Sequence, residues 1–493
     1  MPLVLYFFLS LAALIVGYII YGRITEKLFL PNYNRPTPAE TMTDGVDYVK
    51  LPAWKIFLIQ LLNIAGVGPV FGPILGALYG PAALVWIVLG TLFAGAVHDY
   101  FSGMMSLRYG GKSIPDVIGY TLGNGFKQFM RVFSLVLLVL VGVVFVSAPA
   151  GILTGLTVSK WAWTGMAFWL TVIFAYYFLA TILPIDVIIA RLYPLFALVL
   201  LIMALGVSCG LIFKGYVFYN WNVAPGASVF ANVHPKNLPI WPLMFITIAC
   251  GAISGFHATQ SPLMSRCLVT ERHGRSVFYG AMVAEGAIAL VWATAGMTFY
   301  ASADLLQAAI SQPGGAANVV KEVSLTLLGP VGGVLAILGV VVLPISSGDT
   351  AFRAARLLLS DYFGVSQKKP LPRLLIAVPL FAIGVILAQV DFSVIWRYFG
   401  WSNQTLATLV LWSAAAYSVK RGTLHWAVTI PAVFMTATTV AYICGAPEGF
   451  RLPWNVAGSI GVGVAAASLV WFLIKQGWFR SHVTLELTPE KSA

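Results

Sequence analysis

A few ionisable side chains lie inside long apolar runs, where charged groups are energetically costly. His98 and Asp99 are adjacent, and His257 and Glu285 follow much later in the chain. Ionisable residues at membrane depth usually belong to an ion pathway or a proton relay, and histidine changes its charge near neutral pH. The four residues are therefore candidates for proton coupling. The alternative is structural, with His257 as a hydrogen-bonded core residue and Asp99 paired to a loop arginine.

Two of the apolar runs are interrupted near their middles, at residues 63–69 and 250–262. Glycine and proline weaken a helix interior, and unpaired backbone groups at membrane depth are tolerated only inside protein or beside water. We expect unwound segments whose helix starts offer N–H donors to a carboxylate. Close packing through small residues is the alternative. With two polar residues of a later run, the candidate substrate-binding residues are Gly66, Val67, Gly68, Pro69, Ser254, Gly255, His257, Asn403 and Gln404.

The elements that position these residues are predicted to be membrane-spanning helices. Of the 493 residues, 59% are hydrophobic and 9% are charged, whereas a soluble protein has about 25% charged residues. Apolar blocks of about 20 residues or more match a bilayer core, and only helices fit them in lipid. The sequence predicts an all-α polytopic membrane protein with about thirteen transmembrane helices. The predicted spans are 3–22, 55–79, 82–107, 126–148, 162–182, 186–213, 239–261, 277–300, 319–347, 371–390, 394–419, 424–443 and 455–474.

The distribution of basic residues predicts the orientation of these spans. If the N-terminus is outside, all but six of the 29 Lys and Arg residues fall on the cytoplasmic side, as the positive-inside rule requires. The six exceptions are Lys160, Lys214, Lys236, Lys321, Arg397 and Arg451. The first run lacks the basic start and cleavage site of a signal peptide, so we expect a retained helix. The net charge of +12 is explained by these loops, and no nucleic-acid partner is expected.

The two interrupted spans divide the chain into corresponding halves. Each is followed by four further spans, and because five is odd, the second group enters the membrane from the opposite side. This predicts a five-plus-five inverted repeat of the leucine-transporter type, an architecture that places its binding site at the broken helices. The predicted parts are an extra helix at 1–22, repeat 1 at 55–213, repeat 2 at 239–419, two helices at 424–474 and a cytoplasmic tail at 475–493.

Several motifs resemble the carbon starvation protein A family of bacterial inner-membrane transporters. They are Asp44–Val49, Ile64–Pro73, Ala94–Asp99, Ser254–Pro262 and Phe399–Gln404. The resemblance implies an importer of peptides or pyruvate in the inner membrane, linked to nutrient limitation. That family is placed with the amino acid–polyamine–organocation transporters, which agrees with the predicted repeat. The C-terminal membrane region is shorter here than in the longer members, which leaves the substrate open. A nutrient sensor derived from a transporter, or another amino-acid or organic-acid symporter, is the alternative.

The leucine-transporter architecture also implies a sodium site. Two hydroxyl residues on the third helix of its second repeat bind sodium together with carbonyls of the first broken helix. Carried onto this sequence, the ligands are the hydroxyls of Ser346 and Ser347 and the carbonyls of Leu62, Ala65 and Leu343. Neutral oxygens suit a hard cation, and we expect the two serines at the cytoplasmic end of the ninth span. Local hydrogen bonding of the serines is the alternative, so the coupling ion, sodium or proton, stays open.

Enzyme chemistry is not expected. Tyr109–Ser113 ends like a phosphate-binding loop, but Ser106 stands where that pattern needs glycine. The four cysteines are scattered without paired spacing, which argues against a disulfide frame or a structural zinc site. We expect no cofactor; the expected partners are a small carboxylate-bearing solute and the lipid bilayer, and the oligomeric state is open.

Overall fold

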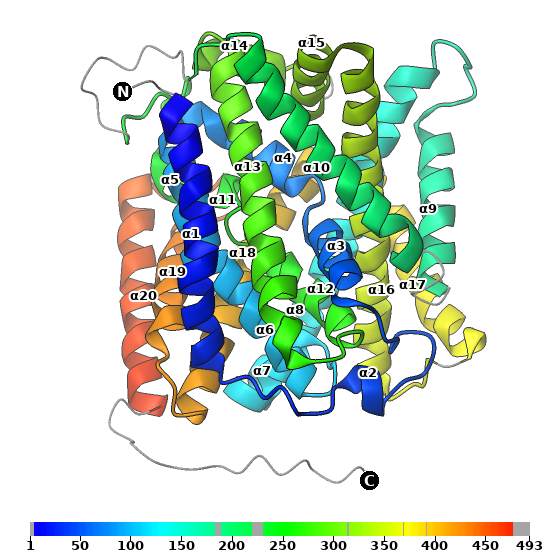
Figure 1. The fold of residues 1–493 in the computed structure, drawn as a ribbon, viewed down its shortest axis with the longest axis vertical. Helices are drawn as coiled ribbons and strands as arrows, with labels where there is room; N and C mark the ends of the chain where they lie inside the picture. The colour runs from blue at the N-terminus through cyan, green and yellow to red at the C-terminus, as the bar shows by residue number, and fades with distance from the viewer. Residues whose placement is uncertain are drawn as a thin grey trace.

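The apolar runs form long helices packed side by side. A computed structural model describes residues 4–182, 189–218, 230–312, 315–367, 369–390 and 392–476, and these residues form helices and loops without strands. The predicted tail at 475–493 lies outside the described residues from position 477 onward. Most long helices run along the vertical axis of Figure 1. The long helices of the described chain include α1 (Val4–Phe29), α8 (Asn124–Thr157), α9 (Met166–Ile182), α10 (Ile189–Phe213), α13 (Gly280–Phe299), α17 (Pro370–Leu387), α18 (Phe392–Lys420), α19 (Trp426–Gly445) and α20 (Trp454–Gln476).

Eight helical segments of the described chain are long and apolar enough to cross a membrane, or nine when one bent pair is included. One of the eight is continuous through α5 (Ala82–Leu89), the π-helical turn η2 (Gly90–Gly95) and α6 (Ala96–Arg108). The chain is thus a multi-pass membrane protein, and the count of thirteen stays a prediction. Shorter elements connect the spans: α2 (Pro38–Thr41), α7 (Ile114–Leu122), η4 (Glu271–His273), η5 (Arg275–Tyr279) and α14 (Ala303–Ile310).

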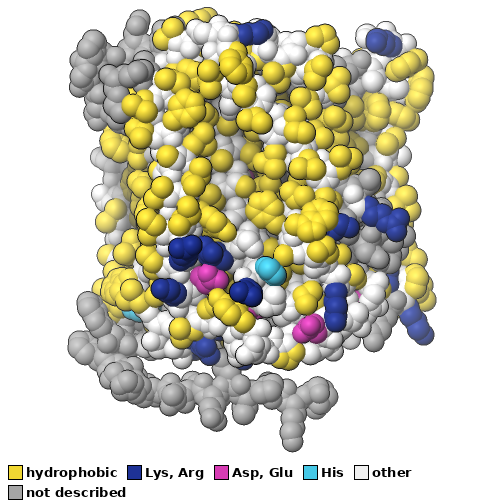
Figure 2. Space-filling view, in the orientation of Figure 1, with side chains coloured by type: hydrophobic (Ala, Val, Ile, Leu, Met, Phe, Trp, Pro, Cys, Tyr) yellow, Lys and Arg dark blue, Asp and Glu magenta, His cyan; other side chains and the backbone are white. Residues whose placement is uncertain are grey.

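The outer surface is apolar and polar groups lie inside. In α1 only 11% of the apolar window is buried, against 83% for the span from Ala82 to Arg108. Large side chains such as Ile15, Leu375 and Ile474 are exposed on outer helices. Hydrophobic side chains cover most of the face in Figure 2, and most of its charged side chains gather toward the lower part. Because lipid replaces water around such a surface, this distribution is the one expected of a bilayer protein.

The first predicted interruption is a break between two helices. α3 (Ala53–Ile64) ends before residues 65–67, and α4 (Gly68–Gly76) follows and continues into η1 (Ala77–Tyr79). The angle between α3 and the segment formed by α4 and η1 is 48°. The structure therefore confirms a helix break at Gly66–Pro69. The carbonyl of Leu62, which the break frees from helical pairing, accepts a hydrogen bond from Ser347.

The second interruption is longer. The turn η3 (Ile240–Met244) and α11 (Phe245–Thr247) precede an unwound segment, residues 248–254, and α12 (Gly255–Ser265) follows. Side chains of neighbouring helices satisfy the unwound carbonyls: Trp86 bonds to Ile248, Thr91 to Gly251 and Gln404 to Ile253. The segment is therefore kept unwound inside protein, which is the condition for irregular backbone at this depth.

The helices that carry the predicted ninth span, 319–347, extend beyond its predicted end. α15 (Ala316–Ile337) bends at Gly329, whose φ of 62° lies in the left-handed region, and Pro330 starts a helix that continues through η6 (Leu338–Val342) and α16 (Leu343–Phe363). Ser346 and Ser347 therefore lie well inside this span and not at its cytoplasmic end. The charged residues after Ser347, which suggested the end of the span, are buried in the bundle.

Candidate functional site

The four candidate proton-coupling residues form one buried cluster. His98 and Asp99 come from α6, His257 from the first turn of α12 and Glu285 from α13. The Asp99 carboxylate contacts both imidazoles, with Oδ1 2.7 Å from His98 Nδ1 and Oδ2 2.9 Å from His257 Nδ1. The second ring nitrogen of His257, Nε2, lies 3.4 Å from Glu285 Oε2. Asp99 and His257 are 158 residues apart in the sequence. The fold therefore links two acids and two histidines from distant parts of the chain.

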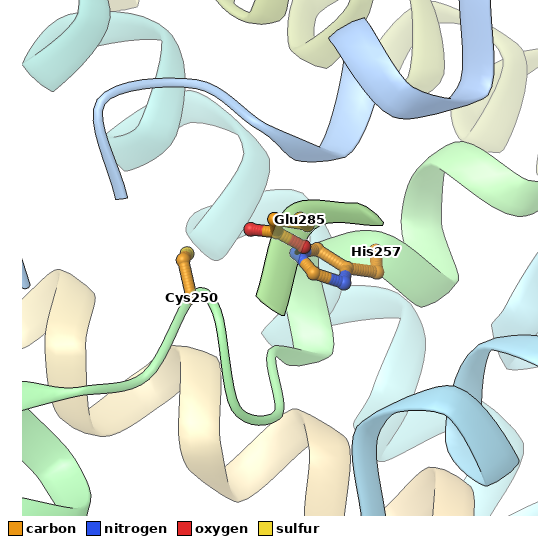
Figure 3. A group of neighbouring side chains, drawn as sticks. All are labelled: Cys250, His257 and Glu285. Atoms are coloured by element: carbon orange, nitrogen blue, oxygen red, sulfur yellow. Dashed lines mark ion pairs between the residues drawn. The ribbon is translucent and has the colours of Figure 1, made fainter. Parts of the chain in front are cut away.

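This cluster is fully enclosed by protein. All four side chains have 0% exposure. In the described part of the chain, His98 Nε2, His257 Nε2 and both oxygens of Glu285 lack a hydrogen bond of ordinary geometry. Buried polar atoms are nearly always paired, and exceptions mark places where a proton, an ion or water is exchanged. Figure 3 shows the imidazole of His257 beside the carboxylate of Glu285, with Cys250 on the unwound segment. This set of groups can carry a proton or hold a metal ion.

The two helix breaks meet directly beside this cluster. A methyl group at Gly68 would overlap the Cβ and Sγ atoms of Cys250, so only glycine allows this approach. Pro69 lies next to Gly251 of the unwound segment, and Gly66 faces the ring of Phe145 and the hydroxyl of Ser347. Val67 is buried, precedes the first turn of α4 and provides no side-chain cap for it. The predicted carboxylate donors at Gly66–Gly68 therefore lie within the protein core.

The predicted residues of the second break bind one another. Asn403 Oδ1 accepts hydrogen bonds from the Phe256 backbone N–H at 2.6 Å and the Ser254 hydroxyl at 3.1 Å. Gly255 packs against the backbone of α18 at Asn403, and Gln404 bonds to the unwound segment as described above. In this structure Asn403 thus occupies the start of α12 that was predicted to face a substrate carboxylate. Asn403 and Gln404 hold α18 against the break.

The candidate sodium ligands are brought together in pairs. The Ser347 hydroxyl lies 3.2 Å from the Leu62 carbonyl oxygen, and the Ser346 hydroxyl lies 2.7 Å from that of Leu343. Both serines are buried, and Ala65 caps the C-terminal end of α3. Only the Ser346 hydroxyl has a local acceptor, which matches the alternative of local hydrogen bonding, while the contact of Ser347 with Leu62 joins α16 to α3 as in the sodium arrangement.

Sequence reasoning missed two further buried groups. Asp349 follows the two serines on α16 and accepts a hydrogen bond of 3.0 Å from Tyr176. Cys250 completes a group with His257 and Glu285 whose ligand atoms all lie within 4.8 Å of one another. Asp349 was missed because the span was ended too early. The spacing of Cys250 carried no signal, because its partners are joined only by the fold.

A buried ion-pair network closes the end of the bundle that carries α2. Asp47, in the segment before α3, lies 3.1 Å from Arg353 Nη1 and 3.2 Å from Arg356 Nη2 of α16. Burial alone would raise the pKa of Asp47, but the positive charges of Arg356 and Arg353 lower it overall. The carboxylate therefore ties the segment before α3 to α16.

We expect Asp47→Asn to lower the free energy of unfolding by about 3–5 kcal/mol, because it leaves buried arginine charge uncompensated. A carboxyl with a lowered pKa stabilises the folded state above its unfolded pKa of about 3.9, and this stabilisation is lost as the pH falls through the folded value. Thermal unfolding in detergent between about pH 7 and pH 3 measures both effects. The variant should lose less stability on acidification than the wild type. Asp304→Asn, at an exposed position of α14, is the control, and equal acid sensitivity of Asp47→Asn and wild type would contradict the assignment.

Solved structures identify the class of fold. The chain aligns with a structure of MhsT in complex with L-phenylalanine at a TM-score of 0.55 and 13% identity, covering 87% of this chain and 99% of that one. A Na⁺-coupled sialic acid symporter aligns at 0.51 and 12% identity, covering 98% and 99%. The fold is therefore of the leucine-transporter type.

The family follows from the sequence. Residues 3–168, 144–328 and 307–442 match the model of the carbon starvation protein CstA family, and the chain belongs to this family. An uncharacterized membrane protein of Haemophilus influenzae is 48% identical over 62% of this chain and 94% of its own length. The peptide transporter CstA of Escherichia coli is 24% identical over 96% and 84%. The pyruvate/proton symporter BtsT of Escherichia coli is 28% identical over 57% and 47%. The named relatives are transporters, which supports the prediction of a non-enzymatic protein.

Proposed function

We propose that this protein is a secondary active transporter that imports small carboxylate-bearing solutes, peptides or pyruvate, by proton-coupled alternating access. The observation that carries the proposal is the chain of contacts from Asp99 through His257 to Glu285. It joins α6, α12 and α13 beside the meeting point of the two breaks. A proton that binds there changes the charge between helices that must move when the site opens. The names of the relatives, a peptide transporter and a pyruvate/proton symporter, support this class of substrate.

The substrate carboxylate is proposed to bind at the start of α4, where residues 66–68 offer backbone N–H groups. An uncapped helix start carries a partial positive charge and suits an anion. Val67, the residue before α4, provides no side-chain cap, whereas Asn403 caps the start of α12. The first break is therefore the proposed anchor for the carboxylate, and the cluster around Asp99 is the proposed coupling site.

The inverted repeat is part of this proposal. α3 to α10 supply the five spans of repeat 1, and the five spans of repeat 2 run from the unwound helix before α12 to α18, with α1 before them and α19 and α20 after them. The break that opens each proposed repeat supports it. The proposed location is the bacterial inner membrane.

We expect the N-terminus and the loop between α10 and η3 to face the periplasm and the C-terminus to face the cytoplasm. The reason is the excess of basic residues on one side of the predicted spans. Fusions to alkaline phosphatase, active in the periplasm, and to a green fluorescent protein, fluorescent in the cytoplasm, measure this at both ends. Finding both termini on the same side would overturn the arrangement of thirteen spans.

Uptake into liposomes tests the coupling ion. With labelled pyruvate and dipeptides, we expect an inward proton gradient to drive accumulation and a sodium gradient alone to have no effect. Ser346→Ala combined with Ser347→Ala should retain proton-driven uptake, because the proposed proton path runs through Asp99, His257 and Glu285 and not through the serines. Sodium-driven uptake, with an apparent sodium affinity at least tenfold weaker in the double variant, would instead assign coupling to the serines. That factor follows from about 1.5–3 kcal/mol for each lost contact to a charged group.

A further inference from the structure

Three side chains with different ligand chemistry meet where the second broken helix unwinds. Cys250 belongs to the unwound segment, His257 to the first turn of α12 and Glu285 to the middle of α13. Their sulfur, nitrogen and oxygen atoms lie within 4.8 Å of one another, and all three residues are buried. In Figure 3 the three side chains converge on one region of the core.

The orientation of His257 is that of a metal ligand. A metal-binding imidazole usually donates one ring N–H to a carboxylate and presents the other nitrogen to the metal. His257 Nδ1 contacts Asp99 Oδ2 at 2.9 Å, and Asp99 is itself held by His98. His257 Nε2 is turned toward Glu285, and neither it nor the Glu285 oxygens has a hydrogen bond of ordinary geometry in the described residues. The ring is therefore already fixed, with its second nitrogen directed at the other two ligands.

The ligand set selects the kind of ion. Sodium, calcium and magnesium prefer oxygen ligands alone, whereas a thiolate, an imidazole and a carboxylate together suit zinc. Zinc bonds of about 2.0–2.3 Å place neighbouring ligand atoms roughly 3.3–3.8 Å apart, a spacing that these atoms reach with side-chain movements of about 1 Å. A divalent ion with one thiolate and one carboxylate is electrically neutral, which suits an enclosed site.

We propose that Cys250, His257 and Glu285 bind a divalent transition-metal ion of the zinc class, with one coordination position left open. The ion ties the unwound segment to α12 and α13 and so stabilises the second broken helix in this arrangement. The inference uses the same His257 and Glu285 atoms as the proposed proton path, so a bound ion and a bound proton compete for them; it does not depend on the proposed function, because binding is measured without transport. A protein that binds zinc but fails to transport would contradict only the function, and the reverse result would contradict only this site.

Cobalt is the spectroscopic probe, because Co²⁺ bound to a thiolate shows a charge-transfer absorption in the near ultraviolet. We expect metal-free protein in detergent to bind one Co²⁺ per chain with this absorption, to release it to Zn²⁺ and to unfold at a higher temperature when loaded. Cys250→Ser should abolish the charge-transfer band. Glu285→Gln should keep the band and weaken Zn²⁺ binding at least tenfold. Cys444→Ser, at a buried cysteine outside the cluster, is the matched control and should behave as wild type.

Two results would overturn the site. One is a wild-type protein without the thiolate band at one equivalent of Co²⁺. The other is a band that persists in Cys250→Ser, which would place the ion at another cysteine. The wild-type spectrum decides the question even if Cys250→Ser fails to fold. Asp99→Asn tests the orientation of the ring, because loss of a ligand-orienting carboxylate weakens metal binding by about 10–100-fold and leaves the thiolate band in place.

Discussion

Asp99→Asn is expected to abolish accumulation of substrate against its gradient while leaving exchange of substrate across the membrane. Asparagine has nearly the same shape and can still bond to His98 and His257, but it carries no negative charge. The proton is therefore no longer stabilised between the two rings. A pH step of one unit supplies about 1.4 kcal/mol for each coupled proton, equivalent to a tenfold concentration ratio. The wild type should approach this ratio and the variant should stay near one.

Liposome uptake with labelled pyruvate and dipeptides, measured with and without substrate inside, separates these two activities. Asp304→Asn serves as the control, because it removes a carboxylate of the same type at an exposed position. Exchange in Asp99→Asn shows that the protein is folded and binds substrate. Undiminished accumulation in this variant and in Glu285→Gln would remove the cluster from the coupling mechanism.

The second large effect is expected at Gly68, where Gly68→Leu should reduce uptake about a hundredfold or more. The leucine side chain would occupy the position of Cys250 and push the two broken helices apart. Displacement of a binding group by about 1 Å can cost a factor of that size. Uptake by purified protein measures the effect, and a thermal unfolding scan shows whether the variant remains folded.

Gly151→Leu is the matched control, because a side chain there meets nothing within 4 Å on the exposed side of α8. The contact between Gly68 and Cys250 can also be tested by a compensating substitution. Gly68→Ala combined with Cys250→Gly removes the atoms that the new methyl group would meet, and it should be more stable than Gly68→Ala alone. Normal substrate affinity in Gly68→Leu would contradict the proposed anchor at the start of α4.

Structural features that depend only on local residue types could be predicted from the sequence. Glycine and proline weaken a helix wherever they stand, so the break at Gly66–Pro69 and the unwound segment before Gly255 follow from residue type. The cost of burying charge singled out Asp99, His257 and Glu285 in the same way. Their mutual contacts, however, depend on how α6, α12 and α13 pack, and no local pattern specifies that packing.

The early end of the predicted ninth span has a physical origin, which is that hydropathy treats each residue as if it faced lipid. Arg353 and Arg356 suggested the end of a span, yet they lie inside the bundle, where both pair with Asp47. The same reasoning hid Asp349. Cys250 went unnoticed because a thiol in an apolar run gives no signal until its neighbours are known. Asn403 was predicted to meet a substrate, and its contact with the start of α12 is one that only the approach of α18 reveals.

The two contacts between the α3 region and α16 have a consequence for the rate of opening. Ser347 holds the carbonyl of Leu62 in the middle of the bundle, and Arg353 and Arg356 hold Asp47 at its end. One contact joins α3 itself to α16 and the other joins the segment before α3 to α16, so α3 and that segment together cannot move away from α16 without breaking both. The activation energy of that step then includes the loss of both contacts, the Ser347–Leu62 hydrogen bond and the Asp47 ion pairs. Turnover should therefore rise steeply with temperature.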